Sequence, residues 1–164
     1  MQKIDKSIQR LERVIICFAF FVMVAVTFAQ VIARFVFNDP ISWSEEVARY
    51  LFVWITLLGA AHAVAFNKHF NVDFALSMFS KETQRKIGWA IALFVLLFAL
   101  VMVGYGSYVA WFVRRQVSPA ILLPMAYPYL CIPVSGVLII VHLLAKLFGK
   151  VENAVPATME GGAE

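Results

Sequence analysis

The sequence predicts an all-α integral membrane protein with four transmembrane helices. Of its 164 residues, 62% are hydrophobic and only 15% are charged, and the mean hydropathy is +0.82. Soluble domains are nearer half apolar and a quarter charged. The apolar residues form four runs of roughly the 20 residues that a bilayer span needs, at about 14–33, 47–66, 87–113 and 129–148. We therefore expect one membrane domain, residues 1–150, rather than a soluble enzyme or a disordered chain.

The first two runs have recognisable boundaries. Basic residues precede the first run, but it is longer than the roughly 7–15 apolar residues of a signal peptide, so we expect a retained helix. Before the second run, Asp39 is placed to cap a helix whose first residue is Pro40. Ser42 and Glu45 also fit a capping box, so a helix is expected to begin near these residues.

The later parts of the sequence predict a short interfacial helix and a mobile tail. The third run is long enough to tilt in the bilayer, and prolines mark the entry to the fourth. Apolar residues within 72–79 fall on one helical face, which predicts an interfacial helix between the second and third runs. Residues 151–164 are small and polar, which predicts a flexible cytoplasmic tail.

The basic residues predict the orientation. Ten of the 14 Lys and Arg residues lie at the side of the two termini, and four lie at the opposite side. By the positive-inside rule, both termini face the cytoplasm. The net charge of +4 comes from short clusters between apolar runs, which is typical of a membrane protein and not of a nucleic-acid-binding face.

The residues predict no catalysis and no cofactor. The sequence has no phosphate-binding loop, nucleophile–base arrangement or Cys/His metal motif. His62 and His142, on different spans, are an alternative pair of haem ligands, as in a respiratory membrane anchor. Their positions near the ends of the spans favour hydrogen-bonded interfacial histidines instead.

The span centres argue against transport by this chain alone. Transporters place polar or ionisable groups near the bilayer midplane, whereas these centres hold Leu, Val, Ile, Phe and Ala and no Asp or Glu. A self-assembling four-span exporter or channel is therefore a second alternative, which the missing carboxylates disfavour.

Small residues recur at helical spacing on two spans. Such residues let membrane helices approach closely, either within this chain or against a partner, and both interpretations stay open. They are Ala25, Ala29 and Ala33 on the first span and Gly59 and Ala63 on the second.

Charged residues cluster around the first connection. Glu45 and Glu46 lie four and three residues before Arg49, a spacing that allows pairing on one helix surface. Arg34 ends the first span and is expected near the same carboxylates, with Trp43 beside them. The cluster is either a solvated ion network of little energy or a clamp that fixes two spans or docks a partner.

At this stretch the sequence resembles the small membrane subunit of tripartite ATP-independent periplasmic (TRAP) transporters, the DctQ-like family. The four-span plan agrees as well, so the resemblance covers nearly the whole chain. The matching stretches are residues 34–38, 40–41, 43–46, 48–54, 59–60 and 71–73.

The resemblance implies a non-catalytic scaffold in the bacterial inner membrane. In this family a periplasmic binding protein captures an organic acid, such as a dicarboxylate or sialic acid. A large multi-span subunit, expected here as a separate polypeptide, carries the substrate and sodium sites. The small subunit packs against the large one and anchors it in the lipid. Arg114 and Arg115 are candidates for docking the binding protein by position alone, the alternative being a charged cap on the third span.

Overall fold

The computed structural model describes residues 2–66 and 81–152, which form four long helices and two short ones. The long helices are α1 (Gln2–Phe35), α2 (Ser44–Phe66), α4 (Lys81–Phe112) and α6 (Cys131–Glu152). The short 3₁₀ helix η1 (Val113–Arg115) ends α4, and α5 (Ala126–Tyr129) leads into α6. All four long helices contain a stretch long and apolar enough to cross a membrane. The predicted all-α fold with four spans is confirmed, and the described residues contain no strand.

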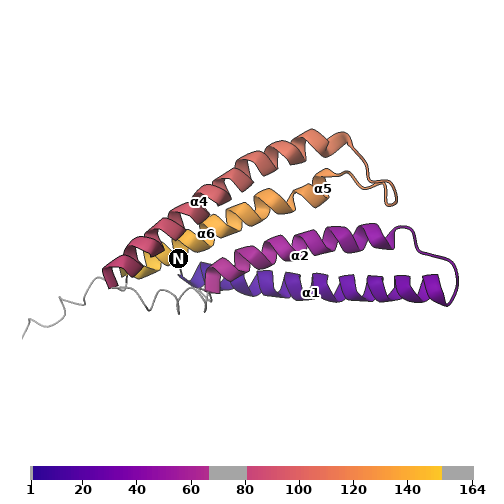
Figure 1. The fold of residues 1–164 in the computed structure, drawn as a ribbon, viewed down its shortest axis with the longest axis horizontal. Helices are drawn as coiled ribbons and strands as arrows, with labels where there is room; N and C mark the ends of the chain where they lie inside the picture. Colours follow the sequence, from indigo (N-terminus) through magenta and orange to yellow (C-terminus); the bar gives the residue numbers. More distant parts are fainter. Residues whose placement is uncertain (1, 67–80, 153–164) are drawn as a thin grey trace, which may run out of the picture.

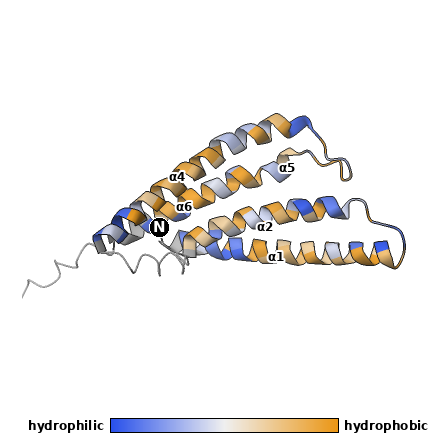
Figure 2. Cartoon of the chain, viewed as in Figure 1, coloured by the Kyte–Doolittle hydropathy of each residue, from blue (hydrophilic) through white to orange (hydrophobic). Residues whose placement is uncertain are grey.

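The helices form two pairs, which contact each other through α2 and α6. Helix α1 packs along α2, α4 packs along α6, and α2 contacts α6. The pairs converge at the end that holds the amino terminus and spread apart at the opposite end, where the connections after α1 and α4 lie (Figure 1). We call these the amino-terminal end and the loop end. Hydrophilic residues concentrate near the two ends of the helices and apolar residues lie between them (Figure 2).

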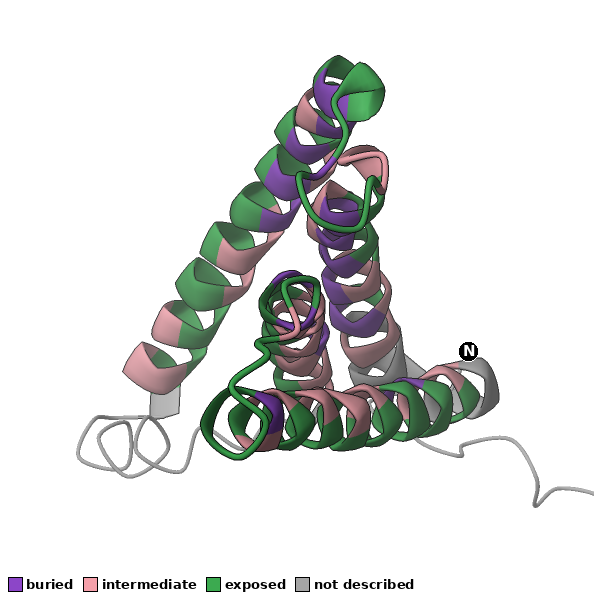
Figure 3. Cartoon of the chain, turned by 90° about the vertical axis from the view of Figure 1, so that its right-hand side faces the viewer, coloured by how far each residue is buried: buried purple, intermediate pink, exposed green. Residues whose placement is uncertain are grey.

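The core is small and lies where α2, α4 and α6 meet. Its buried members are Ala61, Ala99, Met102 and Ile139. Buried positions face neighbouring helices, while exposed ones cover the outside (Figure 3). In the most apolar 18-residue stretch of α1 no residue is buried, whereas 44% of the residues in the corresponding stretch of α6 are buried. Most of the apolar surface therefore faces lipid or another chain.

Two glycines allow α4 and α6 to approach closely. A Cβ added at Gly136 would lie 2.9 Å from Cγ2 of Val103 and 3.0 Å from the carbonyl oxygen of Ala99. A Cβ at Gly106 would lie 2.7 Å from Cγ2 of Ile132. Cβ contacts this short are absent or rare in proteins, so a larger residue at either position would force the facing helix to shift.

The predicted start of the second helix at Pro40 is wrong, because a turn comes first. Helix α2 begins at Ser44, and the backbone N–H of Val47 donates to the carbonyl of Trp43 at 3.1 Å. Trp43, not Ser42, therefore occupies the capping position. The turn is fixed at Ile41, whose N–H donates to Oε1 of Gln30 at 2.9 Å and whose carbonyl accepts the Ser44 hydroxyl at 2.7 Å. The predicted interfacial helix at 72–79 lies outside the described residues. Of the predicted tail, residues 151–164, the first two belong to α6 and the rest lie outside the described residues.

Candidate functional site

Glu46 joins the start of α2 to the loop between η1 and α5. Its Oε2 accepts the backbone N–H groups of Ala120 at 3.0 Å and Ile121 at 3.1 Å. Its Oε1 accepts the hydroxyl of Tyr50, one helical turn onward. Glu46 is buried, with 7% of its surface exposed. Charge-assisted hydrogen bonds of this kind are stronger than neutral ones, so this carboxylate positions the loop over the end of α2.

The loop that Glu46 holds has its own hydrogen bonds. Val117 and Pro124 form an isolated bridge, and the N–H of Ser118 donates to the carbonyl of Leu123 at 2.9 Å. The fully buried Ser118 hydroxyl accepts the N–H of Leu123 at 3.1 Å. Leu122 closes the turn in the left-handed region, with φ of 58°, a conformation that branched or bulky side chains rarely adopt. The loop is therefore a defined structure rather than a simple connection.

The structure does not show the charged residues of the predicted clamp as ion pairs. Among the described residues, no ion pair joins Arg34 or Arg49 to Glu45 or Glu46. The carboxylate of Glu46 is occupied by the loop amides, while Glu45 and both arginines are exposed. The guanidinium of Arg34 lies 5.9 Å from the ring centroid of its neighbour Phe35. A role of these exposed residues and of Trp43 at a partner interface stays a prediction.

A cavity of about 530 Å³ opens beside this contact, between α2, the loop and the start of α6. One part of its wall is polar, with Glu45, Arg49 and Tyr50, and another part is apolar. The apolar part includes Val53 and Ile132. Three charged residues of the predicted clamp, Glu45, Glu46 and Arg49, therefore line this cavity, whereas Arg34 does not.

The two predicted rows of small residues do not lie along helix–helix contacts within the chain. Ala33 is buried, but Ala25, Ala29 and Ala63 are exposed. A Cβ added at Gly59 would meet nothing within 4 Å. Of these positions the structure buries only Ala33, and contact of the others with a partner stays a prediction.

Arg114 and Arg115 lie at the loop end of α4, both exposed. The guanidinium of Arg114 stacks on the ring of Trp111, 3.6 Å from its centroid, and donates to the carbonyl of Trp111 at 2.8 Å. Arg114 therefore already caps its own helix, the alternative weighed from the sequence. Docking of a binding protein by these arginines stays a prediction.

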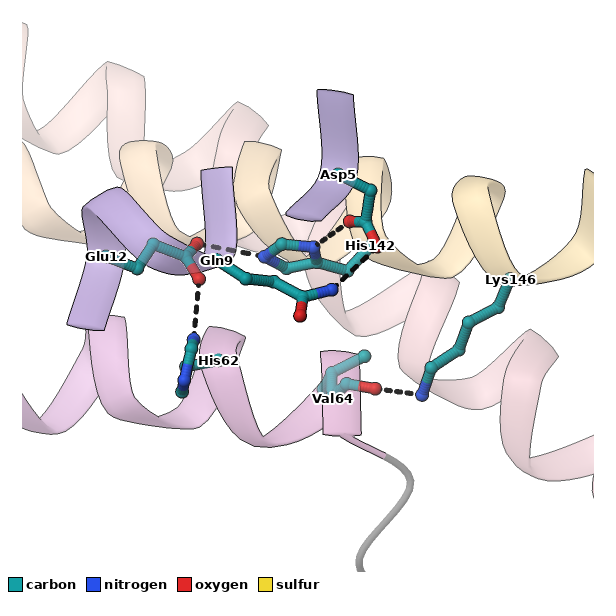
Figure 4. A network of polar contacts seen from close by, with 7 residues as sticks. All are labelled: Asp5, Gln9, Glu12, His62, Val64, His142 and Lys146. Carbon is teal, nitrogen blue, oxygen red and sulfur yellow. Dashed lines mark hydrogen bonds and ion pairs between the residues drawn. The ribbon is translucent and has the colours of Figure 1, made fainter. Parts of the chain in front are cut away.

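At the amino-terminal end, two histidines and two carboxylates form a buried cluster (Figure 4). Nδ1 of His142 lies 2.6 Å from Oδ1 of Asp5, and its Nε2 lies 2.9 Å from Oε1 of Glu12. Nδ1 of His62 lies 2.9 Å from Oε2 of Glu12. Because carboxylates occupy both ring nitrogens of His142, this side chain is not available as a haem ligand, and both histidines are hydrogen-bonded.

Comparison with known proteins identifies the family. Residues 23–153 match the family described as tripartite ATP-independent periplasmic transporters, DctQ component. The chain belongs to the DctQ family. The family is a membrane component of transporters and not an enzyme. With its four membrane-spanning helices, this DctQ-family chain is a multi-pass protein of the bacterial inner membrane.

Individual relatives of this DctQ-family chain carry names with different substrates. It is 28% identical over 152 residues to the sialic acid TRAP transporter small permease protein SiaQ of Vibrio cholerae, covering 90% of this chain and 86% of that protein. It is 35% identical over 112 residues to the isethionate TRAP transporter permease protein DctMQ of Oleidesulfovibrio alaskensis. That alignment covers 66% of this chain and 18% of the longer relative. The ectoine small permease protein TeaB of Halomonas elongata is 26% identical over 134 residues, covering 80% of this chain and 69% of TeaB.

Sequence reasoning missed the partners of Glu46 and of His142 in this DctQ-family chain. Asp5 and Glu12 are seven residues apart, which places them on one face of α1, and they precede the apolar run. That spacing was the available signal for a polar contact with the two histidines. The loop amides that bind Glu46 left no signal, because backbone groups are the same in every sequence.

Proposed function

We propose that this chain is the scaffold subunit of a sodium-driven TRAP transporter that imports organic acids. In this proposal it packs against a separate large subunit, holds that subunit in the bilayer and transports nothing alone. Both termini face the cytoplasm, so the loop end faces the periplasm. There Arg114 and Arg115 help to dock the substrate-binding protein.

The observation that carries the proposal is the exposed apolar surface of α1 and α4. Phe21, Phe28 and Phe35 of α1 are 66–74% exposed, and Phe94, Tyr105 and Trp111 of α4 are 66–72% exposed. A chain that enclosed its own substrate path would bury polar groups between these helices. Here the polar side-chain contacts between different elements lie near the two ends of the helices, and the middle offers long apolar faces for lipid and a partner.

The substrate class rests on the relatives' names. Sialic acid, C4-dicarboxylate and isethionate permease proteins are all among them. The longer DctMQ relative, of which this chain matches only a part, supports a partner that works in one assembly with this region. Sodium coupling is proposed to reside in that partner.

The test combines purification with reconstitution. The tagged chain is extracted from its native membrane in mild detergent, co-eluting proteins are identified by mass spectrometry, and an absorbance spectrum is recorded. We expect one large hydrophobic partner at about one to one and no Soret band. In liposomes with a sodium gradient and the co-encoded binding protein, we expect uptake only when both membrane subunits are present.

Three results would contradict the proposal. A chain that elutes alone or only with itself has no large subunit to support. Substrate flux through the chain alone would identify an exporter or channel. A Soret band that is lost in His62→Ala would identify a haem-binding anchor.

A further inference from the structure

A buried set of charged groups connects three helices at the amino-terminal end. We call Asp5, Gln9, Glu12, His62 and His142 the His142 cluster (Figure 4). The first three residues lie on α1, His62 on α2 and His142 on α6. The His142 side chain is 0% exposed, and the Glu12 side chain is 5% exposed. The transport role proposed above does not use this cluster.

The contacts of the cluster require more protons than neutral histidines supply. Each of its three imidazole–carboxylate contacts, of 2.6, 2.9 and 2.9 Å, needs one hydrogen between nitrogen and oxygen. Two neutral imidazoles bring two hydrogens, and two ionised carboxylates bring none. One additional proton must therefore be bound for all three contacts to form together.

His142 lies at the centre of the cluster. Gln9 donates its amide to Oδ2 of Asp5 at 2.6 Å, so that oxygen already accepts a hydrogen bond. Glu12 faces an imidazole on each oxygen. His142, with a carboxylate at each ring nitrogen, is the group that uses two N–H donors at once.

Other charged groups lie near the cluster: the ammonium of Lys146 interacts electrostatically with Asp5, and Arg13 follows Glu12 on α1. On α6, Lys146 donates its ammonium to the carbonyl of Val64 at the end of α2. On α4, Glu82 and Lys86 pair with each other at 2.8 Å and are largely exposed. Farther along, α4 contributes apolar residues such as Val95 to the core around Ile139.

We propose that His142 carries this additional proton and that the His142 cluster is therefore a proton-dependent contact, which holds the first turns of α1 against α2 and α6. When the proton leaves, His142 retains one N–H for two carboxylates, and one buried carboxylate loses its partner. An unperturbed imidazole is mostly neutral above about pH 6.5. The form in which all three contacts are made therefore binds one more proton at alkaline pH than the form in which the first turns of α1 have come away. Linkage requires the stability of the first form to fall as pH rises.

The experiment measures how tightly the first turns of α1 are held. The full chain in lipid nanodiscs is subjected to hydrogen–deuterium exchange at pH 6.5, 7.5 and 8.5, and protection factors corrected for intrinsic exchange are compared. For residues 6–13 we expect a fall approaching tenfold per pH unit once the proton is lost, since one proton is linked to opening. Residues 95–103 of α4 should show no such slope.

Two variants separate the proton from the contacts. In Asp5→Asn the amide can donate to a neutral His142, which then donates to Glu12, so the contacts remain without the extra proton. We expect the pH slope at residues 6–13 to disappear. Glu82→Gln, which breaks an exposed ion pair at the same end, should retain the slope of the unsubstituted protein.

Either a flat profile in the unsubstituted protein or an unchanged slope in Asp5→Asn would overturn the proposal. If Asp5→Asn loses protection at every pH, nitrogen NMR of the unsubstituted protein labelled at histidine decides. A resonance of His142 with both ring nitrogens protonated at pH 7 supports the proposal, and a neutral tautomer overturns it. Because the inference concerns contacts within one chain, its outcome is independent of the transport proposal.

Discussion

Two adjacent acidic residues at the start of α2 have different environments. Glu46 is buried and accepts two backbone N–H groups of the loop and the Tyr50 hydroxyl. Glu45 is exposed and lines the neighbouring cavity. Residue type and helix position are nearly identical for the pair, so the loop that folds over one side of the helix end creates the difference.

This difference predicts unequal effects of two alanine substitutions. Glu46→Ala leaves the N–H groups of Ala120 and Ile121 without their acceptor, so we expect residues 118–123 to be cut by protease at least fivefold faster. Glu45→Ala should change the cleavage rate by less than twofold. Limited proteolysis of the full chain in nanodiscs, read by mass spectrometry, measures both. Equal rates in the two variants would show that Glu46 does not hold the loop.

The close approach of α4 and α6 depends on glycines and not on the small residues predicted from sequence spacing. Gly136 contacts the α4 backbone at Ala99, and Gly106 contacts Ile132. Gly59, which belongs to the row predicted from spacing, has open space around it. Spacing alone therefore identified small residues without showing which helix faces a neighbour.

The same geometry predicts opposite signs for two glycine substitutions. Gly136→Ala places a methyl group against a backbone oxygen, and overpacking of this kind destabilises by about 1–3 kcal/mol. Gly59→Ala adds a better helix former in open space and should stabilise by about 0.5–1 kcal/mol. Thermal unfolding of the full chain in the same lipid, followed by circular dichroism, gives the comparison. A Gly136→Ala protein as stable as Gly59→Ala would contradict the close approach.

For the whole molecule, the spread of the two helix pairs leaves most of α1 exposed. The exposed small residues Ala25 and Ala29 lie on this helix. In lipid, such residues permit close contact with another helix. Under the proposed scaffold role, that helix belongs to the large subunit.

A small-to-large substitution tests this assignment. We expect Ala29→Leu to reduce recovery of the large subunit in co-purification at least fivefold, because the added side chain separates the two helices. The thermal stability of the isolated chain should not change. Ala90→Leu, which adds the same volume at an exposed position of α4, is the matched control. Undiminished recovery with Ala29→Leu would remove Ala29 from the interface.

The sequence by itself determined the class of the molecule: four apolar helices, with charged residues at their ends. Length and hydropathy suffice for this because a bilayer accepts only segments whose backbone hydrogen bonds are internal. The motif around Trp43 and Glu46 also indicated the protein family. The positions of the two histidines favoured hydrogen-bonded groups over haem ligands.

Tertiary structure decided which groups meet. The acceptor role of Glu46 depends on loop amides some 75 residues away, and the His142 cluster combines residues 137 positions apart. Hydropathy is a property of each segment, whereas a hydrogen bond between segments depends on the rotation and separation of whole helices. Those are set by close contacts such as Gly136 against Ala99, which no local pattern encodes.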